Sequence, residues 1–234
     1  MRVLVLVISS DNFPVYALHR DVWRTYMKSH PNIDCFFIQY NPLVFVPILT
    51  NDTLTLRGQE RYSTVLAKTV DALTYLLPRR PYTHIVRTNL SSVWNFSRLI
   101  EVLASLPSQR LYGGLPLGKG GASGAGILWT RDVAELLIAN RKTLLSIGTA
   151  DDDDIGTFLQ AVGVPLTITH RVDFLSLAHY IEHNDKIPPG SFHYRVKQPN
   201  PEHRLNEEPE MMRRILREHI YTDSTHKVFR VGNR

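Results

Sequence analysis

The sequence predicts an α/β fold in which a mainly parallel sheet is flanked by helices. Residues 3–8 are all valine, leucine or isoleucine, the pattern of a parallel strand buried on both faces. Residues 13–29 then carry apolar side chains at helical spacing, and residues 33–39 form a second apolar run. Strand, helix and strand in this order predict a βαβ unit, whose ligands bind at the carboxyl ends of its strands. Ser9 and Ser10 lie at that end, and no G-x-G-x-x-G dinucleotide motif follows the first strand.

Length and composition are those of one domain. A chain of 234 residues with 43% apolar content can bury a full core. We therefore expect residues 1–234 to form one domain, with residues 198–234 as a C-terminal helical extension. Cys35 is the only cysteine, which excludes an intrachain disulfide and a cysteine metal cage. The net charge of +5 suits an anionic ligand, although a solvated basic surface explains it equally well.

The six apolar residues of the first strand are too few for a membrane span or a signal sequence. We therefore expect a cytoplasmic protein without a membrane span. Nothing in the sequence implies an obligate protein partner.

The middle of the chain continues the alternation of helices and strands. Residues 41–50 are apolar but carry two prolines, which favours an edge segment or a covering loop over an interior strand. Residues 59–77 have one apolar face and predict a long helix, from which Lys68 is expected to reach out to water. A further strand at residues 84–89 runs into polar residues, and Ser97 is the expected N-cap of the next helix.

Residues 111–126 hold seven of the 13 glycines in the chain. From Gly113 they match the start of a phosphate-binding loop, but Gly120 stands where that motif needs Ser or Thr. Ser123 is not the nucleophile of a G-x-S-x-G elbow, because Ala125 replaces the second glycine. Two interpretations stay open. The segment is either a loop whose backbone approaches a flat ligand such as a sugar ring, or an ordinary turn between strands.

A strand and a helix are predicted over residues 126–140, and residues 166–174 are again typical of a strand. Between them, residues 151–154 form the most acidic run of the chain. The apolar helix at residues 155–162 places these carboxylates in its first turn, where the dipole favours negative charge by about 0.3–1 kcal/mol each. Capping accounts for one or two of them. Because four consecutive acids repel one another, we favour a functional role for at least one.

His193, Arg195 and Lys197 alternate along residues 191–197. On an extended segment their side chains project to the same face and form a small row of cations. Such a row suits a diphosphate, and an exposed edge strand protected by charge is the alternative. Residues 208–220 predict a basic amphipathic helix, and the last dozen residues are expected to be loosely held.

Six segments agree, in order and spacing over about 150 residues, with motifs of one enzyme family. They are VLVLVISS at the start, HRDVWRTY (19–26), ERYSTVLAKT (60–69), HIVRTNLSSVW (84–94), SGAGILWTRD (123–132) and DDDDIG (151–156). The chain resembles the GT-A glycosyltransferases and is most similar to their β-1,3-galactosyltransferase and Fringe-like group. This resemblance implies a GT-A fold and transfer of a sugar from a nucleotide-sugar donor, often a UDP-sugar, to a hydroxyl of a glycan or another acceptor.

The resemblance also implies roles for individual residues. The general base of the family falls on Asp152, with Asp151 and Asp153 as the adjacent alternatives. A base without a candidate nucleophile implies, by analogy, inversion at the anomeric carbon. Positive groups lower the barrier to departure of the diphosphate. The candidates for donor binding are Ser9, Ser10, Arg87, Asn89, Ser91, His193, Arg195 and Lys197, and those for acceptor binding are Gly121, Ser123 and Gly124.

One departure from the family concerns the metal. Asn89, Leu90 and Ser91 stand where the family carries its D-x-D carboxylates. Three alternatives follow: transfer without a strongly bound metal, a Mn²⁺ or Mg²⁺ ion held weakly by Asn89, His193 and the donor phosphates, or loss of activity. Hard divalent cations prefer several anionic oxygens, so we favour a weak-metal or metal-free transferase.

The sequence also bears on three other functions. A nucleotidyltransferase acting on sugar phosphates needs a glycine- and arginine-rich signature after the first strand, and residues 9–14 lack it. A catalytically silent module that binds a sugar or nucleotide is favoured by the missing D-x-D pair. Nucleic-acid binding fits the basic pI of about 9.4, but no basic helix with interleaved aromatics supports it, so we expect no nucleic-acid partner.

Overall fold

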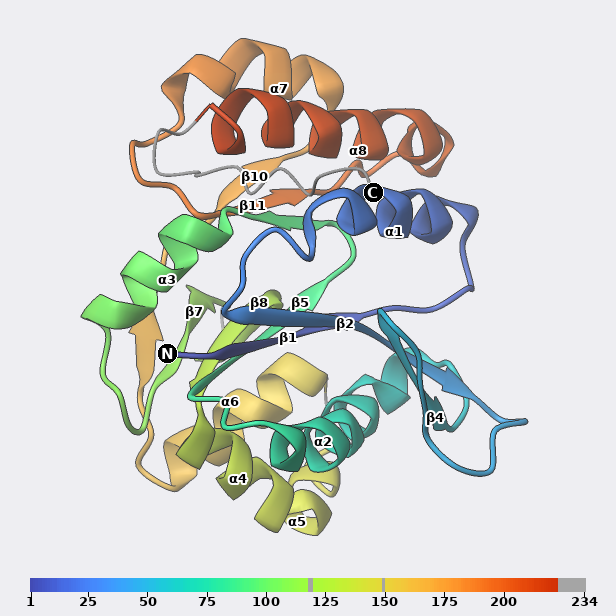
Figure 1. Cartoon of the computed structure of the whole chain (residues 1–234), viewed down its shortest axis with the longest axis vertical. Coiled ribbons are helices and arrows are strands. Elements are labelled where there is room, and N and C mark those ends of the chain that lie inside the picture. The colour runs from blue at the N-terminus through green and yellow to red at the C-terminus, as the bar shows by residue number, and fades with distance from the viewer. Residues whose placement is uncertain (118–119, 149, 223–234) are drawn as a thin grey trace.

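The computed structural model describes residues 1–117, 120–148 and 150–222. A large central sheet divides the molecule (Figure 1). Helices α2, α4, α5 and α6 cover one face, and α1, α3, α7 and α8 lie on the other side, together with a small second sheet. In the described residues, no helix combines the length and apolar character needed to cross a membrane.

The large sheet has eight strands in the order β3-β4-β2-β1-β5-β8-β7-β9. Neighbours are parallel in four of the seven pairs, namely β1 with β2, β1 with β5, β2 with β4, and β7 with β9. The predicted class, an α/β fold with a mainly parallel mixed sheet, is confirmed. The strand bounds are β1 Val3–Ile8, β2 Ile33–Asn41, β3 Ile48–Leu49, β4 Thr53–Arg57, β5 His84–Asn89, β7 Tyr112–Pro116, β8 Ala122–Thr130 and β9 Leu166–Ile168.

Strand β1 lies near the middle of this sheet, and its residues from Val3 to Val7 are fully buried. Its unbroken apolar sequence serves two cores, because alternate side chains point to opposite faces. Val3, Val5 and Val7 pack on the side of α1 and α8, and Leu4 and Leu6 pack on the side of α2 and α4. The expectation of a central, doubly buried strand is confirmed.

Helices α1, α3, α4 and α6 lie close to the predicted positions. Helix α2 begins later than predicted, α8 begins earlier, and α5 and α7 were not predicted. The helix bounds are α1 Pro14–Tyr26, α2 Val65–Leu76, α3 Phe96–Ser105, α4 Arg131–Ala139, α5 Arg141–Leu145, α6 Asp151–Ala161, α7 Leu177–His183 and α8 Pro201–Ile215, the last continued by a π-helical turn at Leu216–Ile220. Short 3₁₀ turns lie at η1 Tyr62–Thr64, η2 Leu77–Arg79 and η3 Asn184–Lys186. Helix α8 packs on α1 through Met211, Met212 and Ile215, which belong to the same core.

The second sheet has three strands in the order β10-β11-β6, with bounds β10 Val172–Phe174, β11 His193–Val196 and β6 Ser92–Trp94. Strand β6 follows directly after the end of β5, and β11 runs antiparallel to it with Arg195 opposite Ser92. The Val196 N–H also donates to the Ser91 carbonyl at 2.9 Å. The late segment 191–197 is therefore fixed beside the polar residues that end β5.

Four details differ from the sequence expectations. Residues 166–174 form two strands, β9 and β10, in different sheets. Strand β4 was not predicted, and the glycine-rich segment is mostly strand because β7 and β8 pair with each other. The N-cap of α3 is Asn95, whose side chain accepts a bond from the Arg98 N–H, so the assignment to Ser97 was wrong. The last dozen residues, for which loose attachment was expected, lie outside the described part of the chain.

Candidate active site

A cleft of about 730 Å³ opens at the carboxyl ends of β1 and β5, between the large sheet, the start of α6 and strand β11. Most of the predicted site residues meet there. The predicted residues that line it are Ser9, Ser10, Arg87, Asn89, Ser91, Ser123, Gly124, Asp151, Asp152, Arg195 and Lys197. Three others do not line it, namely Gly121, Asp153 and His193. The acidic run and the late cations, separated by about 40 residues of sequence, thus face one cavity.

Asp152 is the carboxylate of the acidic run that faces the cleft without an ion pair in the described structure. Its Oδ2 accepts a hydrogen bond from the Gly124 N–H at 3.1 Å, and its Oδ1 accepts one from the Asp153 N–H at 3.2 Å. Two backbone donors therefore fix the carboxylate at the first turn of α6, where the helix dipole also stabilises its charge. An oriented and partly exposed carboxylate of this kind can accept a proton.

Arg87 on β5 is buried, and its guanidinium is engaged by the protein itself. It donates to the Asp151 carboxylate and to the Gly124 carbonyl. The side chains of Arg87 and Asp151 are only 3% and 7% exposed. This buried ion pair connects α6 to strands β5 and β8. Arg87 therefore positions Asp152 indirectly, through its contacts with Asp151 and Gly124.

Positive charge in the cleft exceeds the free negative charge. Of the acids that line it, Glu60 pairs with Lys68, Asp151 with Arg87, and Glu208 with Arg204. Arg195 and Lys197 have no ion pair among the described residues, and the buried Arg195 Nε has no hydrogen-bond partner there. Burial, reinforced by the nearby Arg171, lowers the pKa of Arg195. An anion in the cleft beside this guanidinium would offset the desolvation through its opposite charge.

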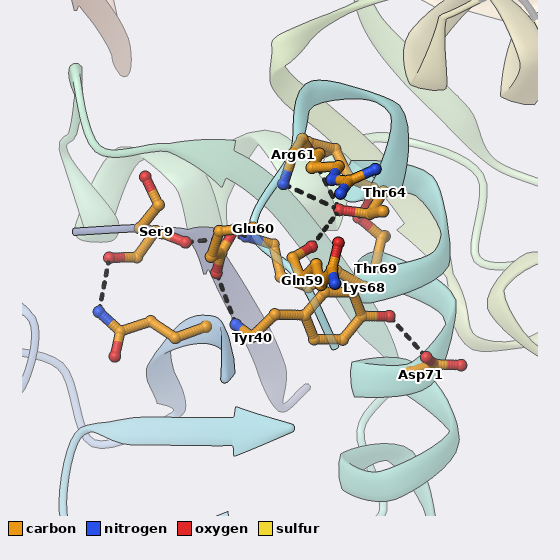
Figure 2. A network of polar contacts seen from close by, with 12 residues as sticks. Ser9, Tyr40, Gln59, Glu60, Arg61, Thr64, Lys68, Thr69 and Asp71 are labelled. Atoms are coloured by element: carbon orange, nitrogen blue, oxygen red, sulfur yellow. Dashed lines mark hydrogen bonds and ion pairs between the residues drawn. The ribbon is translucent and has the colours of Figure 1, made fainter. Parts of the chain in front are cut away.

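Lys68 on α2 is a site residue that the sequence interpretation missed. Its Nζ donates to the Ser9 carbonyl at 2.8 Å and to Glu60 at 2.7 Å, and Glu60 also accepts from the Tyr40 N–H (Figure 2). The residue is 1% exposed, so the expectation that it reaches out to water was wrong. Burial lowers the pKa of Lys68, and Glu60 opposes that effect. The lysine thus anchors the loop after β1, and Glu60 eight residues earlier was the sequence signal for its partner.

His193 does not contribute to the cleft as predicted. Its ring is 3% exposed and stacks on Trp94, with ring centroids 3.8 Å apart. Burial lowers its pKa well below the ordinary value, so the ring is neutral near pH 7 and supplies no cation. The predicted row of three positive groups is reduced to Arg195 and Lys197.

The buried His193 predicts a loss of stability in acid. As pH falls below about 6.5, the unfolded chain takes up a proton on this ring and the folded chain does not, so unfolding becomes easier. The contribution of His193 to the free energy of unfolding is fully present above this pH. Below it, the free energy of unfolding falls by at most ~1.4 kcal/mol per pH unit. Urea unfolding between about pH 7.5 and 5 should show a shallower decline for His193→Gln. An unchanged slope would contradict this prediction, since His84 and His219 alone would then account for it.

Glycines in and just before β8 serve packing within the protein. A Cβ added at Gly126 would overlap the His193 ring, and one at Gly121 would lie 2.8 Å from the Asp152 carbonyl. These close approaches explain why side chains are missing there, without a flat ligand.

We expect Gly126→Ala to destabilise the fold by about 1–3 kcal/mol, because the His193 ring is wedged between strands and cannot move away. Thermal unfolding measures the effect. Gly113→Ala is the matched control in β7, where a Cβ would make an ordinary contact with Leu128 at 3.4 Å. Equal stability of the two variants would contradict this prediction, because it would show that the His193 ring moves to make room for the added methyl group.

The residues present do not fit a strongly bound divalent metal. Asn89 faces the cleft, but Leu90 beside it is buried and His193 lies outside the lining. The described residues contain no group of three or more His, Cys, Asp or Glu side chains that could hold a metal ion. With Asp151 engaged by Arg87, a Mn²⁺ or Mg²⁺ ion would find one free carboxylate where it prefers several anionic oxygens.

The mixed, mostly parallel sheet flanked by helices is consistent with a GT-A-like α/β fold. No protein family model matches the sequence, and no curated protein sequence matches it. Among solved structures, the chain is similar to a crystal structure of a glycosyltransferase involved in the glycosylation of the major capsid of PBCV-1. The TM-score is 0.57 at 11% identity, over 91% of this chain and 100% of the other. At this identity the likeness shows the fold, and the resemblance to the Fringe-like group stays a prediction.

Proposed function

We propose that the protein is a glycosyltransferase that moves a sugar from a nucleotide-sugar donor, with UDP-sugars as the first candidates, to an acceptor hydroxyl. One observation carries this proposal: Asp152 lines the same cleft as Arg195 and Lys197, and none of the three has an ion pair among the described residues. The similarity of the fold to a solved glycosyltransferase supports it. The cleft also opens at the carboxyl ends of parallel strands, where ligands of open α/β sheets bind.

In the proposed reaction, Asp152 accepts the proton of the acceptor hydroxyl as that oxygen attacks the anomeric carbon. The bond from this carbon to the diphosphate oxygen breaks on the opposite side, and its electron pair leaves with the nucleoside diphosphate. Arg195 and Lys197 stabilise the negative charge that develops there. The other carboxylates lining the cleft are held by cations, which supports a single displacement with inversion, the outcome that the resemblance implies. Ser123 and Gly124, beside Asp152, are proposed acceptor contacts.

The proposal requires no strongly bound metal, because protein cations take the place of a metal at the diphosphate. A thermal-shift screen of UDP-, GDP- and ADP-sugars, with and without Mn²⁺, tests both points. We expect one UDP-sugar to stabilise the protein equally well in the presence of a chelator. The proposal fails if no nucleotide sugar binds, and its metal-free part fails if binding or transfer needs Mn²⁺.

The silent binding module is the second candidate, and the missing D-x-D pair at Asn89 favours it. Product analysis separates the possibilities. A transferase releases nucleoside diphosphate from the bound donor, whereas a silent module binds the donor and leaves it intact. Release of pyrophosphate from UTP and a sugar phosphate would instead identify a nucleotidyltransferase.

Replacing the cleft cations should weaken donor binding. We expect Arg195→Gln and Lys197→Gln each to raise the dissociation constant of UDP about tenfold, because each removes a charge-assisted contact worth ~1.4 kcal/mol or more. Isothermal titration calorimetry measures the change. Lys186→Gln is the matched control, since this exposed lysine lies outside the cleft lining. Unchanged affinity in both cleft variants would place the diphosphate elsewhere.

A further inference from the structure

The segment between β2 and β3 exposes a concentrated group of apolar side chains. We call residues 42–48 the apolar loop. Leu43 is 80% exposed, Phe45 81%, Val46 67% and Ile48 49%. The loop contains no charged residue. A contiguous apolar patch of this kind marks a surface that meets another molecule or a membrane.

The backbone of the apolar loop is suited to an apolar surrounding. The Leu43 N–H donates to the Asn41 side chain at 2.9 Å, and the Val44 N–H donates to the Asn41 carbonyl at 3.3 Å. Pro42 and Pro47 have no N–H group. Because an unsatisfied backbone donor costs several kcal/mol in hydrocarbon, a tip with few free donors suits insertion into lipid.

The charges around the apolar loop fit an anionic surface. Between residues 41 and 57 the charged residues are Asp52 and Arg57. Asp52 is paired with Arg24 at 2.8 Å. The exposed Arg57 has no ion pair in the described part of the chain, and its guanidinium lies 5.4 Å from the centre of the Phe45 ring. A cation at the base of an apolar tip matches the order of layers in a bilayer, where anionic headgroups lie above the acyl chains.

The same segment offers little to a second protein chain. Strand β3, at the edge of the sheet, is only Ile48–Leu49, so pairing with another strand would form a very short ladder. We propose that the apolar loop inserts into the interface of a lipid bilayer that carries anionic headgroups. Figure 1 shows the connection from β2 to β4 extending outward beyond the edge of the sheet.

Insertion would also set the position of the cleft. The apolar loop leaves the carboxyl end of β2, which is parallel to β1, and residues that follow β1 and β4 line the cleft. The mouth of the cleft and the apolar loop therefore lie at the same end of the sheet, the one where the parallel strands β1, β2 and β4 finish. This inference does not depend on the proposed function, because lipid binding is measured without catalysis.

The test is co-sedimentation of the full chain with vesicles of phosphatidylcholine alone or mixed with phosphatidylglycerol. We expect binding to the mixed vesicles, at least tenfold weaker binding for Phe45→Asp, and weaker binding at high salt and for Arg57→Gln. The matched control is Ile168→Asp, which places the same charge at a 64% exposed residue of β9, at the opposite edge of the sheet. Failure of the unaltered protein to bind either vesicle, or equal loss in Phe45→Asp and Ile168→Asp, overturns the proposal.

Fluorescence locates the insertion independently. All three native tryptophans are buried, with exposures of 0–1%, so Phe45→Trp adds the one indole on the exposed loop. Vesicles with brominated acyl chains should quench this fluorescence and leave that of the unaltered protein unchanged. Analytical ultracentrifugation tests the alternative that a second copy of the chain covers the apolar loop. If the protein forms a dimer that Phe45→Asp dissociates, and does not bind vesicles, the apolar loop is a dimer interface and the lipid proposal is wrong.

Discussion

Asp152→Asn is expected to lower kcat by about 10²- to 10⁴-fold, the usual contribution of a general base. The affinity for the donor should stay the same, because the amide keeps the shape of the carboxylate and can still accept the bond from the Gly124 N–H. An interaction that acts only in the transition state changes kcat and leaves substrate binding intact. Release of nucleoside diphosphate measures the rate, and calorimetry with the donor measures the affinity.

Asp153→Asn sharpens this test, since Asp153 is next in the chain but does not line the cleft. It should retain transfer, although its N–H bonds to Asp152. Transfer retained by Asp152→Asn and lost by Asp153→Asn would move the role of base to the neighbour. If both variants retained transfer, the acidic run would have no part in the chemistry.

Arg87→Met should destabilise the protein by about 3–5 kcal/mol, the cost of leaving one partner of a buried ion pair without the other. Asp151 would lose its cation, and the Gly124 carbonyl would lose a donor. Urea unfolding gives the free energy directly. Because this is a large share of the stability of a typical domain, the variant should also fold poorly at physiological temperature.

Two further variants test the physical reason. In the double variant Arg87→Met with Asp151→Asn, no charge is left buried alone, so most of the loss should be recovered. Arg2→Met breaks a partly exposed pair with Asp34 and should cost about 0–1 kcal/mol. If the loss of unfolding free energy in the double variant equalled the sum of the losses in the two single variants, Asp151 would not depend on Arg87 to stabilise its charge.

The sequence predicted the parts of the fold that depend on local pattern. Residues 3–8 have no polar alternation, so they had to be a doubly buried strand, and the helical period of residues 13–29 fixed the first crossover. The location of the cleft followed from the rule for carboxyl ends of parallel strands. The resemblance to the GT-A enzymes, and not this rule, predicted that Asp152, Arg195 and Lys197 share one pocket.

What sequence could not show were contacts between distant segments. His193 is buried because Trp94, about 100 residues earlier, stacks on it, and nothing in the local pattern HYRV distinguishes this from an exposed edge. Lys68 was assigned to solvent because its two acceptors, Glu60 and the Ser9 carbonyl, are brought to it by folding. The split of residues 166–174 between two sheets has the same origin, since strand partners are chosen at long range.

The small sheet has a consequence for when the site can exist during synthesis. Strand β6 comes about 100 residues before its partner β11, so it leaves the ribosome well before β11 does. A nascent chain that ends before β11 carries Asp152 but neither Arg195 nor Lys197. The growing polypeptide thus holds an incomplete pocket until β11 has emerged, and a nonsense mutation upstream of residue 191 would leave a product without either cation.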